Sequence, residues 1–174
     1  MRISGKAIAT LAVGISYAAY QFGEYLYYNK FRDKVPSPAI GGLVYCDLLT
    51  ASHSGIYVGA GDIVHLDGEG LIIKTSAENF IKRLGGWNPA LSIFTFCKDG
   101  DPFGIEPVAE YADRQVGRQV DYNLATNNCH RFTASCLLRK QADSSYLSMD
   151  LIKSLKNIHD EVFGESIRQA WEWR

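Results

Sequence analysis

Cys129 is the residue in this sequence with the clearest potential for chemistry, because it directly follows two asparagines. Asparagine is a preferred helix N-cap residue, and apolar residues recur at helical spacing after Cys129, so we expect it to lie in the first turn of a helix. The unpaired N–H groups and the dipole of a first turn favour the nucleophilic thiolate over the thiol. A free cysteine can equally be a small buried hydrophobe, and at this point both interpretations stay open.

A cysteine nucleophile needs a base that takes its proton and a third group that orients the base. The chain has four histidines. We expect His159, which lies among charged neighbours on a predicted C-terminal helix, to be solvated. His130 adjoins Cys129, and consecutive helical side chains point in different directions, so it is poorly placed to accept the thiol proton. His53 and His65 remain as candidates, although each could also be a structural histidine of a strand.

The two candidate histidines, His53 and His65, lie on neighbouring segments of strand character that a glycine-rich loop separates, which is typical of a hairpin. If the loop consists of residues 59–61, His65 falls opposite Gly55, and His53 shares its face one diagonal step away. A two-residue loop would place the two imidazoles on opposite faces. Their pairing is therefore conditional on the turn.

Length and composition limit the class of protein. A chain of 174 residues, 47% hydrophobic and 21% charged, suits one globular domain with a modest extension. A net charge of −1, without a run of interleaved basic and aromatic residues, argues against nucleic-acid binding. The cysteines show no metal-ligand spacing, so we expect no metal site, and we expect reduced thiols at Cys46, Cys97, Cys129 and Cys136.

The remaining pattern alternates strand-like and helical segments, which predicts an α+β fold. Strand character is found at residues 43–46, 54–58, 63–66, 71–74 and 91–97. Helical character is found at residues 76–82, with Ser76 as a possible cap, at 107–115, after Cys129, and at 147–162. The tail at residues 166–174 could pack on the domain or touch a lipid interface.

The N-terminal segment has a membrane-targeting pattern. Residues 7–23 carry no charge, basic residues flank the run, and several tyrosines suit an interfacial belt. A cleaved signal peptide and an alanine-rich helix packed on the domain are the alternatives. The prolines at 36 and 38 end this segment. We therefore divide the chain into an anchor or signal segment at residues 1–34, a catalytic domain at residues 35–142 and a helical extension at residues 143–174.

Three ordered blocks of the sequence resemble the lecithin:retinol acyltransferase family and the related small phospholipase/acyltransferases. They are His-Ser-Gly-Ile-Tyr-Val-Gly at residues 53–59, Val-His-Leu at residues 64–66, and Tyr-x-Leu-x-x-x-Asn-Cys-x-x-Phe at residues 122–132. A Pro-x-x-Gly opening is found at residues 38–41. The resemblance covers roughly residues 36–140.

The resemblance implies a permuted papain-like (NlpC-type) domain, in which an antiparallel sheet packs against helices and an N-terminal apolar helix precedes the domain. By position, it implies that Cys129 is the nucleophile, His53 its base and His65 the group that orients His53. The implied reaction is acyl transfer through a thioester on Cys129. It requires no metal and no organic cofactor.

The resemblance also suggests where substrate would lie, in a region that includes Asn128, His130 and Tyr57. First-turn N–H groups beside the cysteine are suitable oxyanion donors. The chain departs from common family residues beside the base and beside the nucleophile, so substrate identity stays open. The departures are Gly42 in place of Asp, Ser54 in place of an aromatic residue, and His130 and Arg131 in place of Glu and His.

We therefore expect a cysteine-dependent acyltransferase or phospholipase-type hydrolase that acts on lipid acyl esters. Residues 7–28 would contact the membrane, and the protein would be single-pass through its N-terminal helix, or secreted or periplasmic if that segment is cleaved. The alternative functions are a permuted papain-like thiol peptidase or amidase, and a non-catalytic membrane-associated binding module of the same fold.

Overall fold

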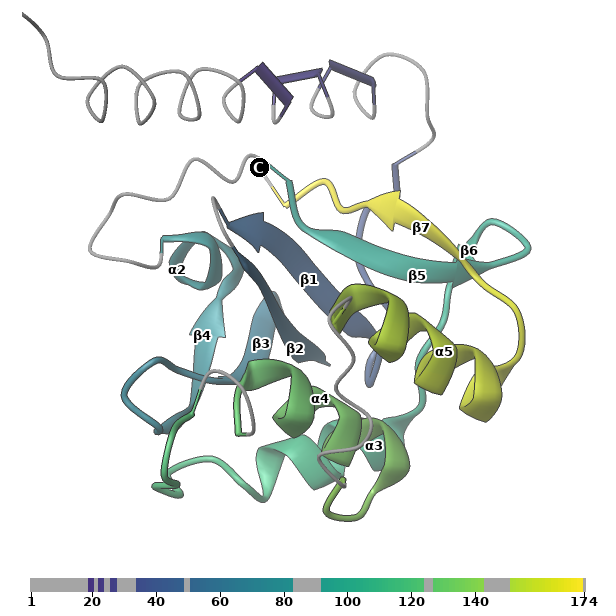
Figure 1. Ribbon diagram of the computed structural model, residues 1–174. Coiled ribbons are helices and arrows are strands. Elements are labelled where there is room, and N and C mark those ends of the chain that lie inside the picture. Colours follow the sequence, from purple (N-terminus) through teal and green to yellow (C-terminus); the bar gives the residue numbers. More distant parts are fainter. Residues whose placement is uncertain are drawn as a thin grey trace, which may run out of the picture.

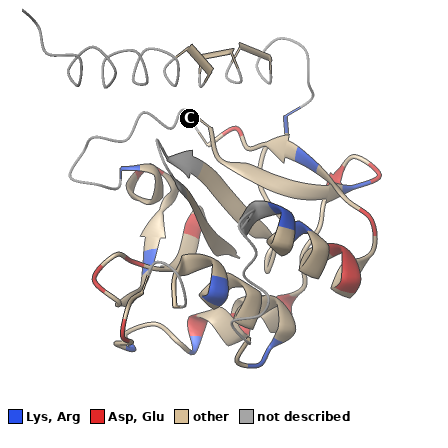
Figure 2. Ribbon diagram, viewed as in Figure 1, with Lys and Arg blue, Asp and Glu red and all other residues tan. Residues whose placement is uncertain are grey.

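The structure, a computed structural model, consists of one antiparallel sheet with helices packed against it (Figure 1). It describes residues 19–20, 22–23, 26–27, 34–48, 51–82, 92–123, 127–142 and 151–173. The predicted α+β class is confirmed. Basic and acidic side chains are interspersed over the helices and loops rather than separated by sign (Figure 2).

In the described part of the chain, seven strands form the sheet, in the order β4-β3-β2-β1-β5-β6, and β7 also pairs with β5. Every strand pairing is antiparallel. The strands are β1 (Leu43–Leu48), β2 (Ala51–Gly59), β3 (Asp62–Leu66), β4 (Ile72–Ser76), β5 (Phe94–Lys98), β6 (Asp101–Pro102) and β7 (Ile167–Ala170). The five predicted strands are all present, and β2 and β3, which carry the candidate histidines, lie beside each other inside the sheet.

The described helices of the domain are α2 (Ala77–Ile81), α3 (Glu106–Asp113), α4 (Cys129–Leu138) and α5 (Leu151–Phe163). α4 packs on β2 and β3 and contacts both α3 and α5, whereas α2 packs on β3 and β4. Ser76 caps α2 as predicted, because its side chain accepts a hydrogen bond from the N–H of Asn79. The helices therefore bury two different surfaces of the sheet.

Alternation along β1 shows how the sheet supports two cores. Leu43 and Tyr45 belong to the core that α3, α4 and α5 cover, whereas Val44 and Cys46 belong to a second core that includes Phe80 of α2. Successive side chains of a strand point to opposite faces, so an unbroken apolar run serves both layers. The same alternation determines the direction of each side chain on β2.

The β2–β3 hairpin has a two-residue loop, which by itself would place the two imidazoles on opposite faces. Its turn consists of Ala60 and Gly61, with φ angles of +55° and +85°, and Gly59 pairs with Asp62. Positive φ at both central residues suits the right-handed twist of a hairpin. The condition of a loop at residues 59–61 is therefore not met.

A β-bulge nevertheless restores the register that was predicted for a three-residue loop. The pairing shifts between Tyr57 and Gly59, so that Ile56 faces Val64. An extra residue in one strand reverses the change of face that a shorter loop would cause. His65 therefore falls next to Val64 in the ladder, opposite Gly55, as predicted.

The C-terminal extension is only partly helical. α5 ends at Phe163, and residues 167–170 form β7, which pairs Phe94 with Ala170 and Cys97 with Ile167. Trp171 is buried, and its Nε1 donates to the carbonyl of Pro36 at 3.1 Å. The tail packs on the domain because it supplies backbone partners to β5 and an aromatic side chain to the second core.

The predicted membrane anchor falls mostly outside the described residues. Within the described part of the chain, no helix combines the length and the apolar character that crossing a bilayer requires. Four large side chains of this segment are described and exposed, namely Tyr20, Phe22, Leu26 and Tyr27.

Candidate functional site

Cys129 is the first residue of α4, and the helix is capped as the sequence predicts. The N-cap residue Asn128 has extended backbone, and its Oδ1 accepts hydrogen bonds from the N–H groups of His130 and Arg131 at 3.0 and 3.1 Å. The side chain of Cys129 is only 5% exposed. The thiol therefore lies at the positive end of a short, capped helix.

The hairpin brings His53 and His65 together. Nε2 of His53 lies 3.2 Å from Nδ1 of His65, the ring centroids are 4.9 Å apart, and the two planes are nearly perpendicular. Both imidazoles are buried, at 3% and 1% exposure. One ring nitrogen must donate to the other, so this bond fixes the tautomers of the pair together.

Gly55 makes room for this pair. A Cβ at this position would lie 2.7 Å from Cγ2 of Ile63, 2.8 Å from the carbonyl oxygen of Val64 and 3.1 Å from Cβ of His65. Any larger residue would therefore push β3 away from β2. The glycine of the His-x-Gly block has a steric role at the point where the two histidines meet.

Phe80 of α2 covers both imidazoles, and the sequence did not predict this contact. Its ring centroid lies 4.7 Å from that of His53 and 5.2 Å from that of His65. Phe80 is fully buried in the second core. The histidine pair therefore has an aromatic wall on the face of the sheet that α2 covers.

His130 binds the start of α4 to β2. Its Nδ1 lies 2.8 Å from Oγ of Ser54, and its Nε2 lies 3.0 Å from the carbonyl oxygen of Ser52. Because a carbonyl can only accept, Nε2 carries the proton and Nδ1 accepts from the Ser54 hydroxyl. The hydroxyl of Thr133 lies 2.9 Å from both Oγ of Ser54 and the carbonyl oxygen of Cys129.

Burial determines the charge of His130. The ring is 1% exposed, and burial lowers its pKa to about 4, although the hydrogen bond to the Ser52 carbonyl acts in the opposite direction. The imidazole is therefore neutral near pH 7. Its contacts agree with the expectation that it does not take the thiol proton, because both ring nitrogens bind β2.

His53 lies between the two β2 residues that His130 contacts. Ser52 and Ser54 point toward α4, and alternation directs the imidazole of His53 to the other face, toward Phe80. The start of the helix that carries Cys129 is therefore bound to the residues on both sides of His53, through the carbonyl of Ser52 and the hydroxyl of Ser54.

Tyr57 lies at the other end of β2, roughly 13 Å from His53 at about 3.3 Å per residue. Its hydroxyl lies 3.0 Å from Oγ of Ser37 and accepts from the N–H of Gly61 at 3.2 Å. Its ring packs on Trp171. These contacts connect Tyr57 to the hairpin turn and not to the histidine pair.

The prediction that His159 is solvated is wrong. Its ring is 1% exposed and packs between Phe96 and Phe163, with centroid distances of 5.1 and 4.9 Å. Burial lowers its pKa to about 4, against the attraction of Asp160. Position 159 is four residues after Leu155, so the helical period places it on the buried face.

All four cysteines are described and buried, and none of them forms a disulfide. Burial, with a smaller contribution from Asp101, raises the pKa of Cys97 to about 11, and burial also raises the pKa of Cys136. Among the described residues, no group of three potential ligands is placed to hold a metal ion.

These features define an α+β domain in which a helix-capped cysteine and a histidine pair are carried by adjoining elements. No protein-family model matches the sequence. Partial similarity is found to the genome polyproteins of avian encephalomyelitis virus, with 32% identity over 100 residues for strain L2Z and 30% over 99 residues for strain Van Reokel. Each match covers 53% of this chain and 4% of the polyprotein. The chain thus spans a small fraction of these relatives.

Proposed function

We propose that the protein is a cysteine-dependent acyltransferase or phospholipase-type hydrolase that acts on lipid acyl esters through a thioester on Cys129. The observation that carries the proposal is the attachment of the Cys129 helix, through His130, to the two residues that flank His53, which is itself bonded to His65. The motifs that resemble the lecithin:retinol acyltransferase family fall on β2, β3 and the start of α4. This placement supports a permuted papain-like (NlpC-type) arrangement.

The tautomers of the histidine pair determine how the base would act. If Nε2–H of His53 donates to Nδ1 of His65, Nδ1 of His53 is left to accept a proton. In this proposal His65 orients the base, and Nδ1 of His53 removes the proton of the Cys129 thiol at the N-terminal end of β2. The Cys129 sulfur and this nitrogen must come within hydrogen-bond reach in the reacting complex.

The proposed reaction has two acyl-transfer steps. The Cys129 thiolate attacks the ester carbonyl, the C–O bond breaks, and the leaving alcohol takes the proton from His53. Water or an acceptor hydroxyl then attacks the thioester and gives its proton to His53, the C–S bond breaks to release the acyl product, and the Cys129 thiolate takes that proton back from His53. The N–H groups of His130 and Arg131 already bind Asn128, so the oxyanion needs other donors.

Membrane contact through residues 7–28 is part of the proposal. The exposed Tyr20, Phe22, Leu26 and Tyr27 support it, because large apolar and aromatic side chains on a helix suit a lipid interface. We propose a single-pass arrangement, with a secreted or periplasmic protein as the alternative.

The test offers the purified full chain phosphatidylcholine vesicles and measures free fatty acid and the intact mass of the protein. We expect fatty acid release and a hydroxylamine-sensitive fatty acyl adduct on Cys129, both lost in Cys129→Ala. Cys136→Ala is the matched control, because it removes a thiol of raised pKa from the same helix. Activity unchanged in Cys129→Ala would contradict the proposal.

Two other outcomes would identify the alternatives. A peptidyl adduct on Cys129, formed from peptide substrates when vesicles give none, would favour a thiol peptidase or amidase. The absence of any adduct, together with a Cys129 thiol that is no more reactive than the other cysteines, would favour a non-catalytic binding module.

A further inference from the structure

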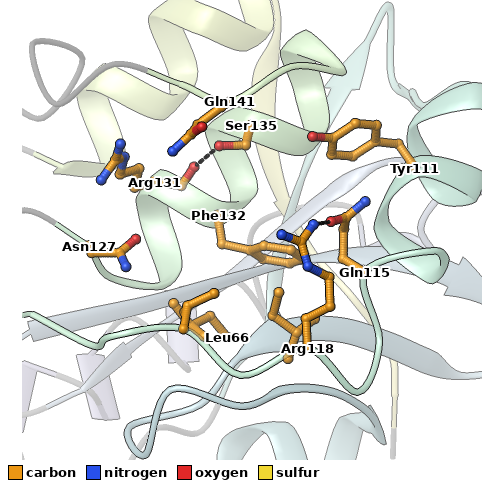
Figure 3. Close-up of a pocket in the computed structure, with 11 residues that line it drawn as sticks. Leu66, Tyr111, Gln115, Arg118, Asn127, Arg131, Phe132, Ser135 and Gln141 are labelled. Atoms are coloured by element: carbon orange, nitrogen blue, oxygen red, sulfur yellow. Dashed lines mark hydrogen bonds between the residues drawn. The ribbon is translucent and has the colours of Figure 1, made fainter.

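A pocket of about 230 Å³ lies between α3 and α4 (Figure 3). Tyr111 lines it on α3, Arg131 and Phe132 line it on α4, and Leu66 of β3 lies below them. Cys129 is not among the lining residues. The pocket borders the proposed acyl-transfer site, because Asn127 and Arg131 are each two residues from Cys129, but neither His53 nor His65 lines it.

The floor of the pocket is apolar. Phe132 and Leu66 are buried in the core that α3, α4 and α5 cover, and Ile72 of β4 continues the same surface. The ring of Phe132 lies in the middle of the lining side chains in Figure 3. A ligand in the pocket would thus place part of its surface against the core, where burial of apolar area is favourable.

The rim is positively charged. Arg118 and Arg131 both line the pocket, and none of its lining residues is Asp or Glu. Nη1 of Arg118 donates to Oε1 of Gln115, and Nε of Arg131 donates to the carbonyl of Ala142, so each guanidinium has a fixed neighbour. A guanidinium has five N–H donors, and its planar fork matches the oxygens of a carboxylate or a phosphate.

We propose that this pocket binds a small amphiphilic anion, that is, a phosphate monoester or carboxylate on a short apolar chain. The charged group lies at Arg118, and the chain lies on Phe132 and Leu66, which line the same pocket. The volume is below the roughly 300–1,000 Å³ of pockets for drug-sized ligands, so the chain is short or extends into solvent.

The test is calorimetric titration of the full chain with hexyl phosphate. We expect saturable binding, and weaker binding of both inorganic phosphate, which lacks the chain, and hexanol, which lacks the charge. A titration with hexanoate shows whether a carboxylate can replace the phosphate. Loss of a charge-assisted hydrogen bond in Arg118→Gln should weaken hexyl phosphate binding by about tenfold or more.

Arg114→Gln is the matched control, because Arg114 has the same charge, is exposed near the end of α3 and does not line the pocket. We expect the affinity of this variant for hexyl phosphate to stay within about twofold of wild type. This change is well below the tenfold effect of a lost charge-assisted hydrogen bond. Arg118→Lys keeps the charge but loses the fork, and it should bind with intermediate affinity.

Equal losses in Arg118→Gln and Arg114→Gln would overturn the proposal, because they would indicate a general charge effect. Equal affinity for hexyl phosphate and inorganic phosphate would show an adventitious ion only, and equal affinity for hexanol would show that the charge plays no part. Cys129→Ala should bind hexyl phosphate like wild type, so this test is separate from that of the proposed activity.

Discussion

At the scale of single residues, two departures from the resembled family contact each other. Ser54 stands where an aromatic residue is common, His130 stands where Glu is common, and the two side chains are hydrogen-bonded at 2.8 Å. A small hydroxyl at position 54 leaves room for the imidazole and donates to its Nδ1. We interpret the two residues as a coupled pair that connects α4 to β2.

The coupled pair can be tested by a double-mutant cycle on His130→Ala and Ser54→Ala. Each change removes one partner from a buried hydrogen bond, so the double variant should lose less stability than the sum of the single losses, by about 0.5–3 kcal/mol. Urea unfolding provides the measurement. The control cycle pairs His130→Ala with Ser37→Ala, whose hydroxyl binds at the other end of β2. Additivity in both cycles would refute the coupling.

At the scale of elements, the N-cap of α4 controls both the stability of the helix and the reactivity of its first residue. Asn128→Ala should destabilise the protein by about 1 kcal/mol, because two N–H groups lose their acceptor. Asn128→Asp keeps the acceptor but adds a negative charge beside Cys129. A negative charge disfavours the thiolate and raises the thiol pKa.

The measurement for this helix start is iodoacetamide labelling near pH 6, read by mass spectrometry. Cys129 should label faster than Cys97 and Cys136, whose pKa values burial raises, and should label more slowly in Asn128→Asp than in wild type. In Asn128→Ser, Cys129 should label at the wild-type rate. If Asn128→Asp leaves the Cys129 rate unchanged, the helix start does not activate the thiol.

Several elements and contacts of the site could be predicted from the sequence, because they rest on local rules. The capped helix follows from the asparagines before Cys129, whereas the meeting of His53 with His65 could be predicted only on the condition of a register, which a two-residue loop and a bulge together produce. The bulge near Val58 could not be predicted, since it depends on how the turn fits the twist of the sheet.

Contacts between distant segments were missed for a different reason. The packing of Phe80 on the histidine pair and the pairing of β7 with β5 depend on tertiary geometry that no local pattern encodes. The burial of His159 is an exception, because its spacing from Leu155 contained the signal. The expectation that His159 is solvated rested on its charged neighbours, whereas the helical period indicated a buried position.

At the scale of the whole molecule, two buried neutral histidines make the fold sensitive to acid. The pKa values of His130 and His159 are lowered by burial from about 6.5 to about 4. The unfolded chain therefore binds more protons than the folded chain between these values. The contribution of these two neutral histidines to stability is fully present above about pH 6.5 and is lost as the pH falls toward 4.

This acid sensitivity should appear between pH 7.5 and pH 5 as a loss of about 2 kcal/mol in unfolding free energy for each of the two histidines. His159→Leu removes one of them while filling the space between Phe96 and Phe163 with an apolar side chain. The unfolding free energy of this variant should fall less than that of wild type over the same pH range, and the difference should be about that amount. Urea unfolding at both pH values tests this, and an unchanged pH dependence would contradict it.

The pairing of the two ends of the domain has a consequence for synthesis. Val35 bridges Trp171, and β7 covers β5 along most of its length. These contacts join segments that are 70 to 136 residues apart, from Cys97↔Ile167 to Val35↔Trp171, so they form late and slowly compared with the β2–β3 hairpin. Until residue 171 has left the ribosome, β5 has an unpaired backbone edge beside apolar side chains, and the nascent chain is open to association with other strands.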